Sequence, residues 1–156
     1  SPNEDSYKVW YGIVCYEMKF FDEAKRVFLY LYSASVDDER VLLYLTRTMN
    51  ALREHGQVVD ILKENIKTKH NSKLLFEWGF AHFKNVELEE AEQIFKLSIE
   101  THPDDKNAYY FLSRIYCKKG EFEEAIQILN DLLEKQPTEE KMIREQINAI
   151  ELLRSF

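Results

Sequence analysis

The sequence predicts an all-α fold, a solenoid of about four helix pairs followed by one further helix. Three observations support this class. Small and turn-forming residues recur 34 positions apart, the chain has only 4 glycines and 3 prolines in 156 residues, and 45% of the residues are apolar. So few turn residues argue against a turn-rich β fold, and this apolar content suffices for one domain with a substantial core. The recurring pairs are Ala91 with Ala125, Pro103 with Pro137, and Gly79 with Ser113.

The recurrence divides the chain into four units and a tail, which we take as one domain over 1–156. The units cover 5–38, 39–71, 72–105 and 106–137, and a last helix covers 138–155. Apolar residues at helical spacing, interrupted by short polar breaks, predict two helices in each unit. The predicted helices are 5–18 and 22–33, 38–53 and 57–67, 72–84 and 87–101, and 107–119 and 122–135.

The register of the second unit has two readings. If Gly56 matches Gly120, the first helix of this unit starts about three residues later than in its neighbours. If the spacing is strict, Thr46 takes the place of Gly79. Both readings keep the two helices of this unit.

The tail is predicted to be a ninth helix. Pro137 ends the helix before it, since proline cannot continue a helix, and Thr138 is a good N-cap. Glu139 and Glu140 then fall in the first turn, where carboxylates suit the helix dipole. This helix is either the cap that a solenoid needs or the first helix of a further repeat. Its apolar face consists of Ile143, Ile147, Ile150 and Leu153.

The pattern resembles the tetratricopeptide repeat, a helix-turn-helix of 34 residues. The fourth unit carries its marks at Tyr109, Leu112, Ser113, Tyr116, Gly120, Phe122, Ala125, Leu129 and Pro137. The third unit does so at Leu75, Trp78, Gly79, Ala91, Phe95 and Pro103, and the first at Tyr11, Gly12, Phe21, Ala24 and Phe28. Val36 replaces the proline of the first unit, and the second unit fits poorly. The resemblance implies a right-handed superhelix that acts as a protein-protein interaction scaffold or adaptor.

In the family, the first helix of each pair lines a concave surface. Phase then predicts an aromatic, mildly basic groove. Its charged residues are Arg47, Lys73, Lys84, Arg114 and Lys118 with Glu17 and Glu77, which give +3 of a total charge of -7 and leave -10 elsewhere. Phe76, Phe80 and Phe83 also have the spacing of a core stripe, so core packing is the alternative reading for them. The predicted partner-binding residues are Trp10, Ile13, Tyr16, Leu43, Arg47, Asn50, Lys73, Phe76, Phe80, Phe83, Tyr110 and Arg114.

Such a groove suits a peptide or helix of another protein, one with apolar anchors and acidic residues. The carboxylate clamp that holds chaperone C-termini is not expected, because only Lys73 matches its pattern and Glu77 and Phe111 occupy places that need asparagine and arginine. The net negative charge argues against nucleic acid. The alternative function is a structural segment of a longer solenoid or assembly, acting through its ends or convex face and able to self-associate.

Chemistry-bearing motifs are sparse, so we predict no enzyme, no metal site and no cofactor. The four histidines do not stand at metal-ligand spacing on one helix. Glutamates gather at two predicted helix starts one period apart, which indicates capping and not acid-base catalysis. Those glutamates are Glu87, Glu89 and Glu90, then Glu121, Glu123 and Glu124.

The cellular compartment of the protein is indicated by its two thiols and by the absence of long apolar runs. Cys15 and Cys117 lie 102 residues apart, too far in a stacked array to form a disulfide, and unpaired thiols fit a reducing, cytoplasmic setting. The longest apolar run, 9–16, is far below the roughly 20 residues that span a bilayer. The opening Ser-Pro-Asn is that of a fragment or processed chain, so an upstream targeting segment stays open.

Overall fold

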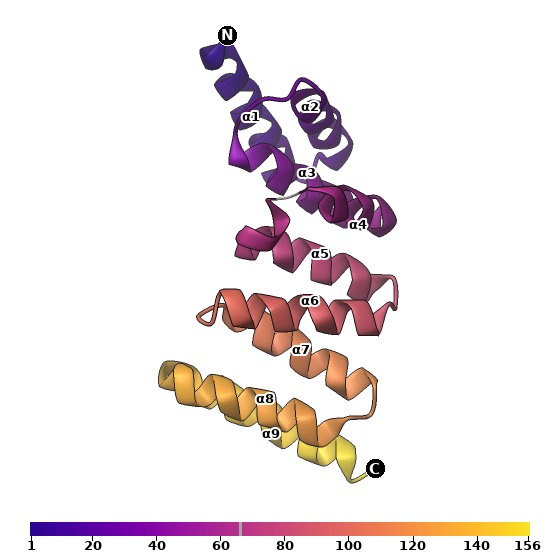
Figure 1. Cartoon of the computed structure of the whole chain (residues 1–156), viewed down its shortest axis with the longest axis vertical. Coiled ribbons are helices and arrows are strands. Elements are labelled where there is room, and N and C mark those ends of the chain that lie inside the picture. The colour runs from indigo at the N-terminus through magenta and orange to yellow at the C-terminus, as the bar shows by residue number, and fades with distance from the viewer. Residues whose placement is uncertain (66) are drawn as a thin grey trace. The chain divides into compact units, whose positions relative to one another are not determined.

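The computed structural model describes residues 1–65 and 67–156, and every regular element of these residues is a helix (Figure 1). The all-α prediction is therefore confirmed. The chain forms two compact units, Ser1–Thr68 and Lys69–Phe156, each described here by itself. That both belong to one domain stays a prediction.

The first unit contains two helix pairs. They are α1 (Pro2–Glu17) with α2 (Phe21–Ser33), and α3 (Glu39–Ala51) with α4 (His55–Glu64). Helix α1 begins before the predicted residue 5 because Ser1 caps it, with the Ser1 hydroxyl accepting from the Glu4 amide. Helix α4 ends short of the predicted residue 67, and residue 66 lies outside the described residues. A 3₁₀ turn, Thr68–His70, follows at the boundary between the units.

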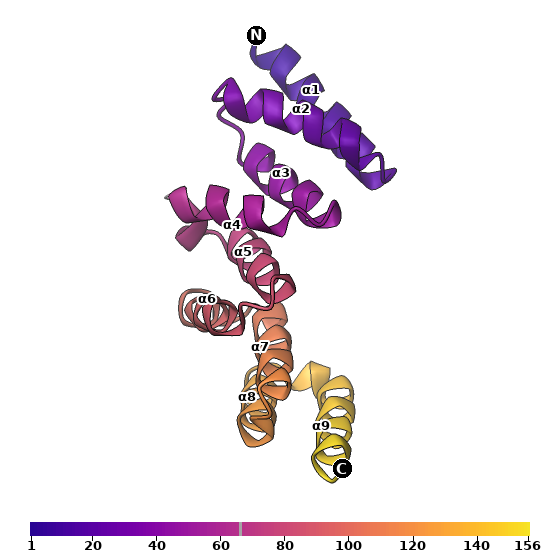
Figure 2. The same ribbon diagram turned by 90° about the vertical axis from the view of Figure 1, so that its right-hand side faces the viewer.

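The second unit contains two further pairs and the terminal helix (Figure 2). They are α5 (Ser72–Lys84) with α6 (Leu88–Thr101), α7 (Lys106–Lys118) with α8 (Phe122–Lys135), and α9 (Glu140–Arg154). The prediction that Thr138 caps α9 is wrong. Pro137 is already at the start of a 3₁₀ turn, Pro137–Glu139, which leads directly into α9, and no side chain caps that helix.

The turns between paired helices settle the register of the second unit. In each turn one residue has a left-handed backbone, and these residues follow one another at spacings of 34, 33 and 34. Arg53 therefore matches Gly120, Thr46 takes the place of Gly79, and Gly56 lies inside α4. The left-handed residues are Lys19, Arg53, Val86 and Gly120, with φ of 64°, 63°, 60° and 78°.

Identical backbone hydrogen bonds close these turns. In the last one, the amide of Glu121 donates to the Tyr116 carbonyl at 2.8 Å and the amide of Gly120 donates to the Cys117 carbonyl at 3.0 Å. In the second, Glu54 donates to Met49 at 2.8 Å and Arg53 to Asn50 at 3.0 Å. This is the Schellman pattern, which needs a left-handed residue and favours glycine there. Only one of the four turns has glycine.

Val86 is the least suitable residue for such a turn, because a β-branched side chain is strained at positive φ. Its side chain is 76% exposed and contributes little packing. We expect Val86→Gly to raise the free energy of unfolding by about 0.5–1 kcal/mol, the strain relieved minus the greater chain entropy of glycine. Urea denaturation measures the change. The reverse substitution, Gly120→Val, should lower the midpoint, and a lower midpoint for Val86→Gly would contradict the strain.

Small residues let the paired helices approach closely. A Cβ atom on Gly12 would lie 2.7 Å from Phe28 Cζ, and one on Gly79 would lie 2.7 Å from Phe95 Cε2. In the other two repeats leucine replaces the phenylalanine, and a larger residue replaces the glycine. The residues at these equivalent positions are all buried, and they are Gly12 with Phe28, Thr46 with Leu62, Gly79 with Phe95, and Ser113 with Leu129.

Candidate functional site

An aromatic cluster connects the first three helices of the second unit, and Phe111 of α7 lies at its centre. The Phe111 ring stacks on Phe95 of α6, with centroids 5.5 Å apart and planes at 23°. Three rings of α5 meet Phe111 edge-on. Their centroid distances to Phe111 are 5.1 Å for Phe76, 5.9 Å for Phe80 and 5.7 Å for Phe83. These rings therefore pack helices together, as the core reading of the α5 stripe predicts, while the groove reading stays a prediction.

Three cations rest on this aromatic cluster. The Arg114 guanidinium carbon lies 4.9 Å from the Phe111 centroid and 5.3 Å from that of Phe83. Lys118 Nζ lies 5.3 Å from the Phe83 centroid, and Lys84 Nζ lies 5.5 Å from the ring of Phe80. All three are exposed, and no carboxylate of the described residues forms an ion pair with them. Their charges are therefore open to an external anion.

The first unit repeats this arrangement around Tyr44 of α3. The Tyr44 ring stacks on Phe28 at 5.7 Å and 21°, and Tyr16 meets it edge-on at 5.4 Å. The Arg47 guanidinium carbon lies 5.2 Å from the same ring. Each of these residues has its counterpart 67 positions later, so the unit duplicated here is a pair of repeats. The counterparts of Tyr16, Phe28, Tyr44 and Arg47 are Phe83, Phe95, Phe111 and Arg114.

Arg40 provides a contrast in the same unit. Its guanidinium carbon lies 5.1 Å from the Trp10 ring, but its nitrogens also donate to both carboxylate oxygens of Asp38, at 2.7 and 3.0 Å. These hydrogen bonds hold the pKa of Asp38 below its usual value and raise the pKa of Arg40. The charge of Arg40 is therefore matched within the chain, unlike that of Arg47, which has no such pair in the described part.

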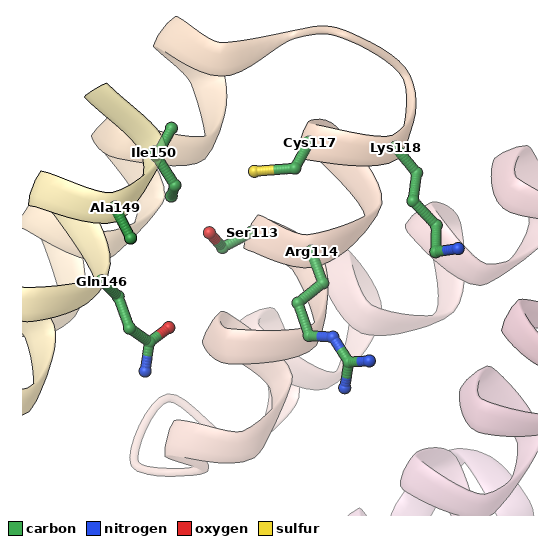
Figure 3. Close-up of a pocket in the computed structure, with 7 residues that line it drawn as sticks. All are labelled: Ser113, Arg114, Cys117, Lys118, Gln146, Ala149 and Ile150. Atoms are coloured by element: carbon green, nitrogen blue, oxygen red, sulfur yellow. The ribbon is translucent and has the colours of Figure 1, made fainter. Parts of the chain in front are cut away.

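A pocket of about 320 Å³ lies between α7 and α9 (Figure 3). The Cys117 thiol and the Ser113 hydroxyl point toward α9, whereas the side chains of Arg114 and Lys118 extend along the α7 side. Burial raises the pKa of Cys117, so its free thiol stays protonated at neutral pH. The pocket thus has half-buried and buried side chains at its base and the cations Arg114 and Lys118 at its side. Its lining consists of Ser113, Arg114, Cys117, Lys118, Gln146, Ala149 and Ile150.

The predicted site residues divide by exposure. Trp10, Lys73 and Arg114 are exposed, and Tyr16, Arg47, Phe76, Phe80 and Tyr110 are half-buried. The buried ones are Ile13, Leu43, Asn50 and Phe83.

Two of these residues are engaged in polar contacts inside their units. Tyr110 donates its hydroxyl to Glu139 at 3.3 Å, and the Asn50 side-chain oxygen lies 2.8 Å from His55 Nδ1. A role for any of the twelve residues in partner binding stays a prediction.

Sequence reasoning missed the α9 wall of the pocket. Gln146 and Ala149 lie on a helix that was interpreted only as a cap, and their contribution depends on how α9 packs beside α7. The alternation of apolar and polar residues carries no signal for that packing angle.

Comparisons with known proteins agree with this architecture. The tetratricopeptide repeat family model matches residues 82–144. The solved structure of MamA is similar over 97% of this chain and 84% of its own, with 20% identity and a TM-score of 0.79. YrrB, a tetratricopeptide-repeat protein with an unusual peptide-binding site, is similar over 88% and 71%, with 20% identity and a TM-score of 0.73. TTC0263, a thermophilic tetratricopeptide-repeat protein of Thermus thermophilus, is similar over 95% and 81%, with 19% identity and a TM-score of 0.73.

No curated protein matches the sequence. The stacked helix pairs define the class of fold, a helical solenoid. Residues 82–144 match the tetratricopeptide-repeat family, and the fold of the chain is that of tetratricopeptide-repeat proteins, which are generally interaction scaffolds.

Two features are missing from the part of the chain that the structure describes. It contains no helix with the length and apolarity needed to cross a bilayer. These described residues also contain no group of three or more His, Cys, Asp or Glu side chains placed to hold a metal ion.

Proposed function

We propose that the face of α5 and α7, with the pocket beside α9, binds a peptide or helix of a partner protein that carries acidic residues next to apolar ones. The observation that supports this most strongly is the position of Arg114. Its guanidinium lies on two rings and beside the pocket, and no carboxylate of the described residues pairs with it. A partner carboxylate would find a charge that is already positioned.

Preorganisation is the proposed source of affinity. Rings packed around Phe111 hold Arg114 against the helix face, so less side-chain entropy is lost when an anion binds. A guanidinium can donate two parallel hydrogen bonds to one carboxylate, while its face stays on the ring. The pocket next to it offers Ile150 and Ala149 to an apolar side chain of the same ligand.

Arg47 is proposed to play the corresponding role in the first unit, since it rests on Tyr44 as Arg114 rests on Phe111. The remaining predicted residues, among them Trp10 and Lys73, would add apolar and basic contacts to their own units. The peptide-binding site of YrrB supports the choice of a peptide ligand, because that protein has the same fold.

A matched pair of peptides tests this function. One is a 12-residue peptide of aspartate, glutamate and leucine, and the other has asparagine and glutamine in place of the acids. We expect the acidic peptide alone to bind, and Arg114→Gln to weaken it about tenfold, which is the loss of about 1.4 kcal/mol for one charge-assisted contact. Isothermal titration calorimetry measures the affinity, and rising salt should reduce it.

The control variant is Arg144→Gln, because Arg144 is exposed on α9 and already donates to Glu140 at 2.8 Å. It should leave the affinity unchanged, and neither variant should shift the melting temperature by more than a degree or two. Equal binding of the neutral peptide, or an Arg114→Gln affinity equal to that of the parent chain, would contradict the proposed site.

A further inference from the structure

Helix α1 of the first unit exposes an apolar face, whose residues belong neither to the pocket nor to the aromatic cluster of the second unit. Tyr7 is 73% exposed, Trp10 55%, Tyr11 51% and Val14 51%. Four large apolar residues at helical spacing form a stripe along one side of the helix. Such a stripe on the surface of a folded protein is typical of an interaction site.

The other repeats show what normally covers this stripe. The same positions of α3 and α7 lie under the second helix of the preceding repeat, α2 in the first unit and α6 in the second. There Tyr44 stacks on Phe28 and Phe111 stacks on Phe95, and the three neighbouring positions are buried. The counterparts of Tyr7, Trp10, Tyr11 and Val14 are Val41, Tyr44, Leu45 and Thr48 in α3, and Ala108, Phe111, Leu112 and Ile115 in α7.

The two covering helices share a sequence pattern. Each has two acidic residues in its first turn followed by alanine, and three positions after the alanine has a β-branched residue followed directly by phenylalanine. The phenylalanine supplies the ring on which the aromatic residue of the next helix stacks. The pattern is Asp22-Glu23-Ala24 with Val27-Phe28 in α2, and Glu89-Glu90-Ala91 with Ile94-Phe95 in α6.

We propose that the α1 stripe binds an amphipathic helix of another protein, one that presents a β-branched residue and a phenylalanine as α2 and α6 do. The phenylalanine would stack on Trp10 as Phe28 stacks on Tyr44. A second folded copy of this chain is a poor source of such a helix. Phe28 and Phe95 are both 0% exposed, so the helices of the described residues with this pattern have already buried it.

This inference does not depend on the acidic-peptide site. Trp10 is the one residue that both proposals use, since it was also among the predicted groove residues. Tyr7 and Val14 belong to the α1 stripe alone, so substitutions at these two positions separate the proposals. Both side chains are more than half exposed, and their replacement by polar residues should leave the fold intact.

The probe is a synthetic peptide with the sequence of residues 87–101 but with glutamine at every glutamate, so that it offers no carboxylate to the acidic-peptide site. It is stapled on its polar face because an isolated helix of this length is marginal in water. Fluorescence anisotropy with the full chain should show saturable binding. The double variant Tyr7→Ser, Val14→Asp should weaken binding at least tenfold, as should aspartate at the peptide position of Phe95. Arg114→Gln should bind the probe as the parent chain does.

Three results would overturn the proposal. The first is no binding of the stapled probe at millimolar protein, and the second is binding that the double variant leaves unchanged. The third is a dimer of the chain in light scattering that the double variant abolishes, which would show that a second copy covers the α1 stripe. A parent chain that is monomeric and binds the probe through Tyr7 and Val14 supports it.

Discussion

A serine in place of Gly79 should lower the free energy of unfolding by about 2 kcal/mol, because the added atoms overpack a closed core. A Cβ atom there would lie 2.7 Å from two carbons of the Phe95 ring. That ring is fully buried and has Phe76 and Phe111 against it, so it has little room to move away. The serine hydroxyl itself is a minor cost, since a helical serine can donate to the carbonyl one turn earlier, as Thr46 does to Leu42 at 3.0 Å.

The partner substitution should reverse the loss. Phe95→Leu alone leaves a cavity and costs about 1–2 kcal/mol, but the double variant has the combination found in the fourth repeat, Ser113 with Leu129. We expect the double variant to be more stable than the sum of the single effects predicts, by about 1–2 kcal/mol. Urea denaturation of all four chains measures this coupling. Additive effects would show that the small and large residues of the pair do not compensate each other.

Replacing Phe111 with alanine should cost about 3 kcal/mol, within the range for removing a large aromatic side chain from a packed site. The ring lies between α5, α6 and α7 and meets Phe76, Phe80, Phe83 and Phe95. Thermal and urea unfolding measure the loss. Tyr44→Ala should act in the same way in the first unit, because Tyr44 stacks on Phe28 and meets Tyr16 edge-on, as Phe111 does with the equivalent residues.

A second variant at this position separates packing from binding. Phe111→Leu keeps most of the apolar volume but removes the nearer of the two rings on which Arg114 rests, 4.9 Å away against 5.3 Å for Phe83. Its loss of stability should be clearly smaller than that of alanine, while the affinity for the acidic peptide should fall nearly as far as in Arg114→Gln. An affinity equal to that of the parent chain would show that the ring does not position Arg114.

Sequence periodicity predicted the helices well, because each pair repeats the same apolar spacing and ends in the same turn. It left the second unit open, since Gly56 is a strong turn signal and Arg53 is not, yet Arg53 is the residue with positive φ. The local backbone hydrogen bonds that close the turn outweigh the preference of the residue. Ser1 and Pro137 show the same limit at helix starts, where capping geometry decides the boundary.

The predicted groove was less well defined by phase alone. Around a helix, the positions that face a groove lie next to the positions that face the neighbouring helix. Ile13, Leu43 and Phe83 are therefore buried, although their places in the repeat resemble that of Arg114. The charged members of the set, Arg47, Lys73 and Arg114, are not buried. An arginine on an aromatic ring stays at the surface because its guanidinium is costly to bury without a partner.

The succession of helices within each unit also affects how the chain reaches its fold. In each unit a helix packs mainly against its neighbours in sequence, as α6 does against α5 and α7. Such a low contact order requires only short loops to close, so folding should be fast and should propagate outward from whichever pair forms first. In the second unit, α6 and α7 share the Phe95–Phe111 stack and are the natural place for that nucleus.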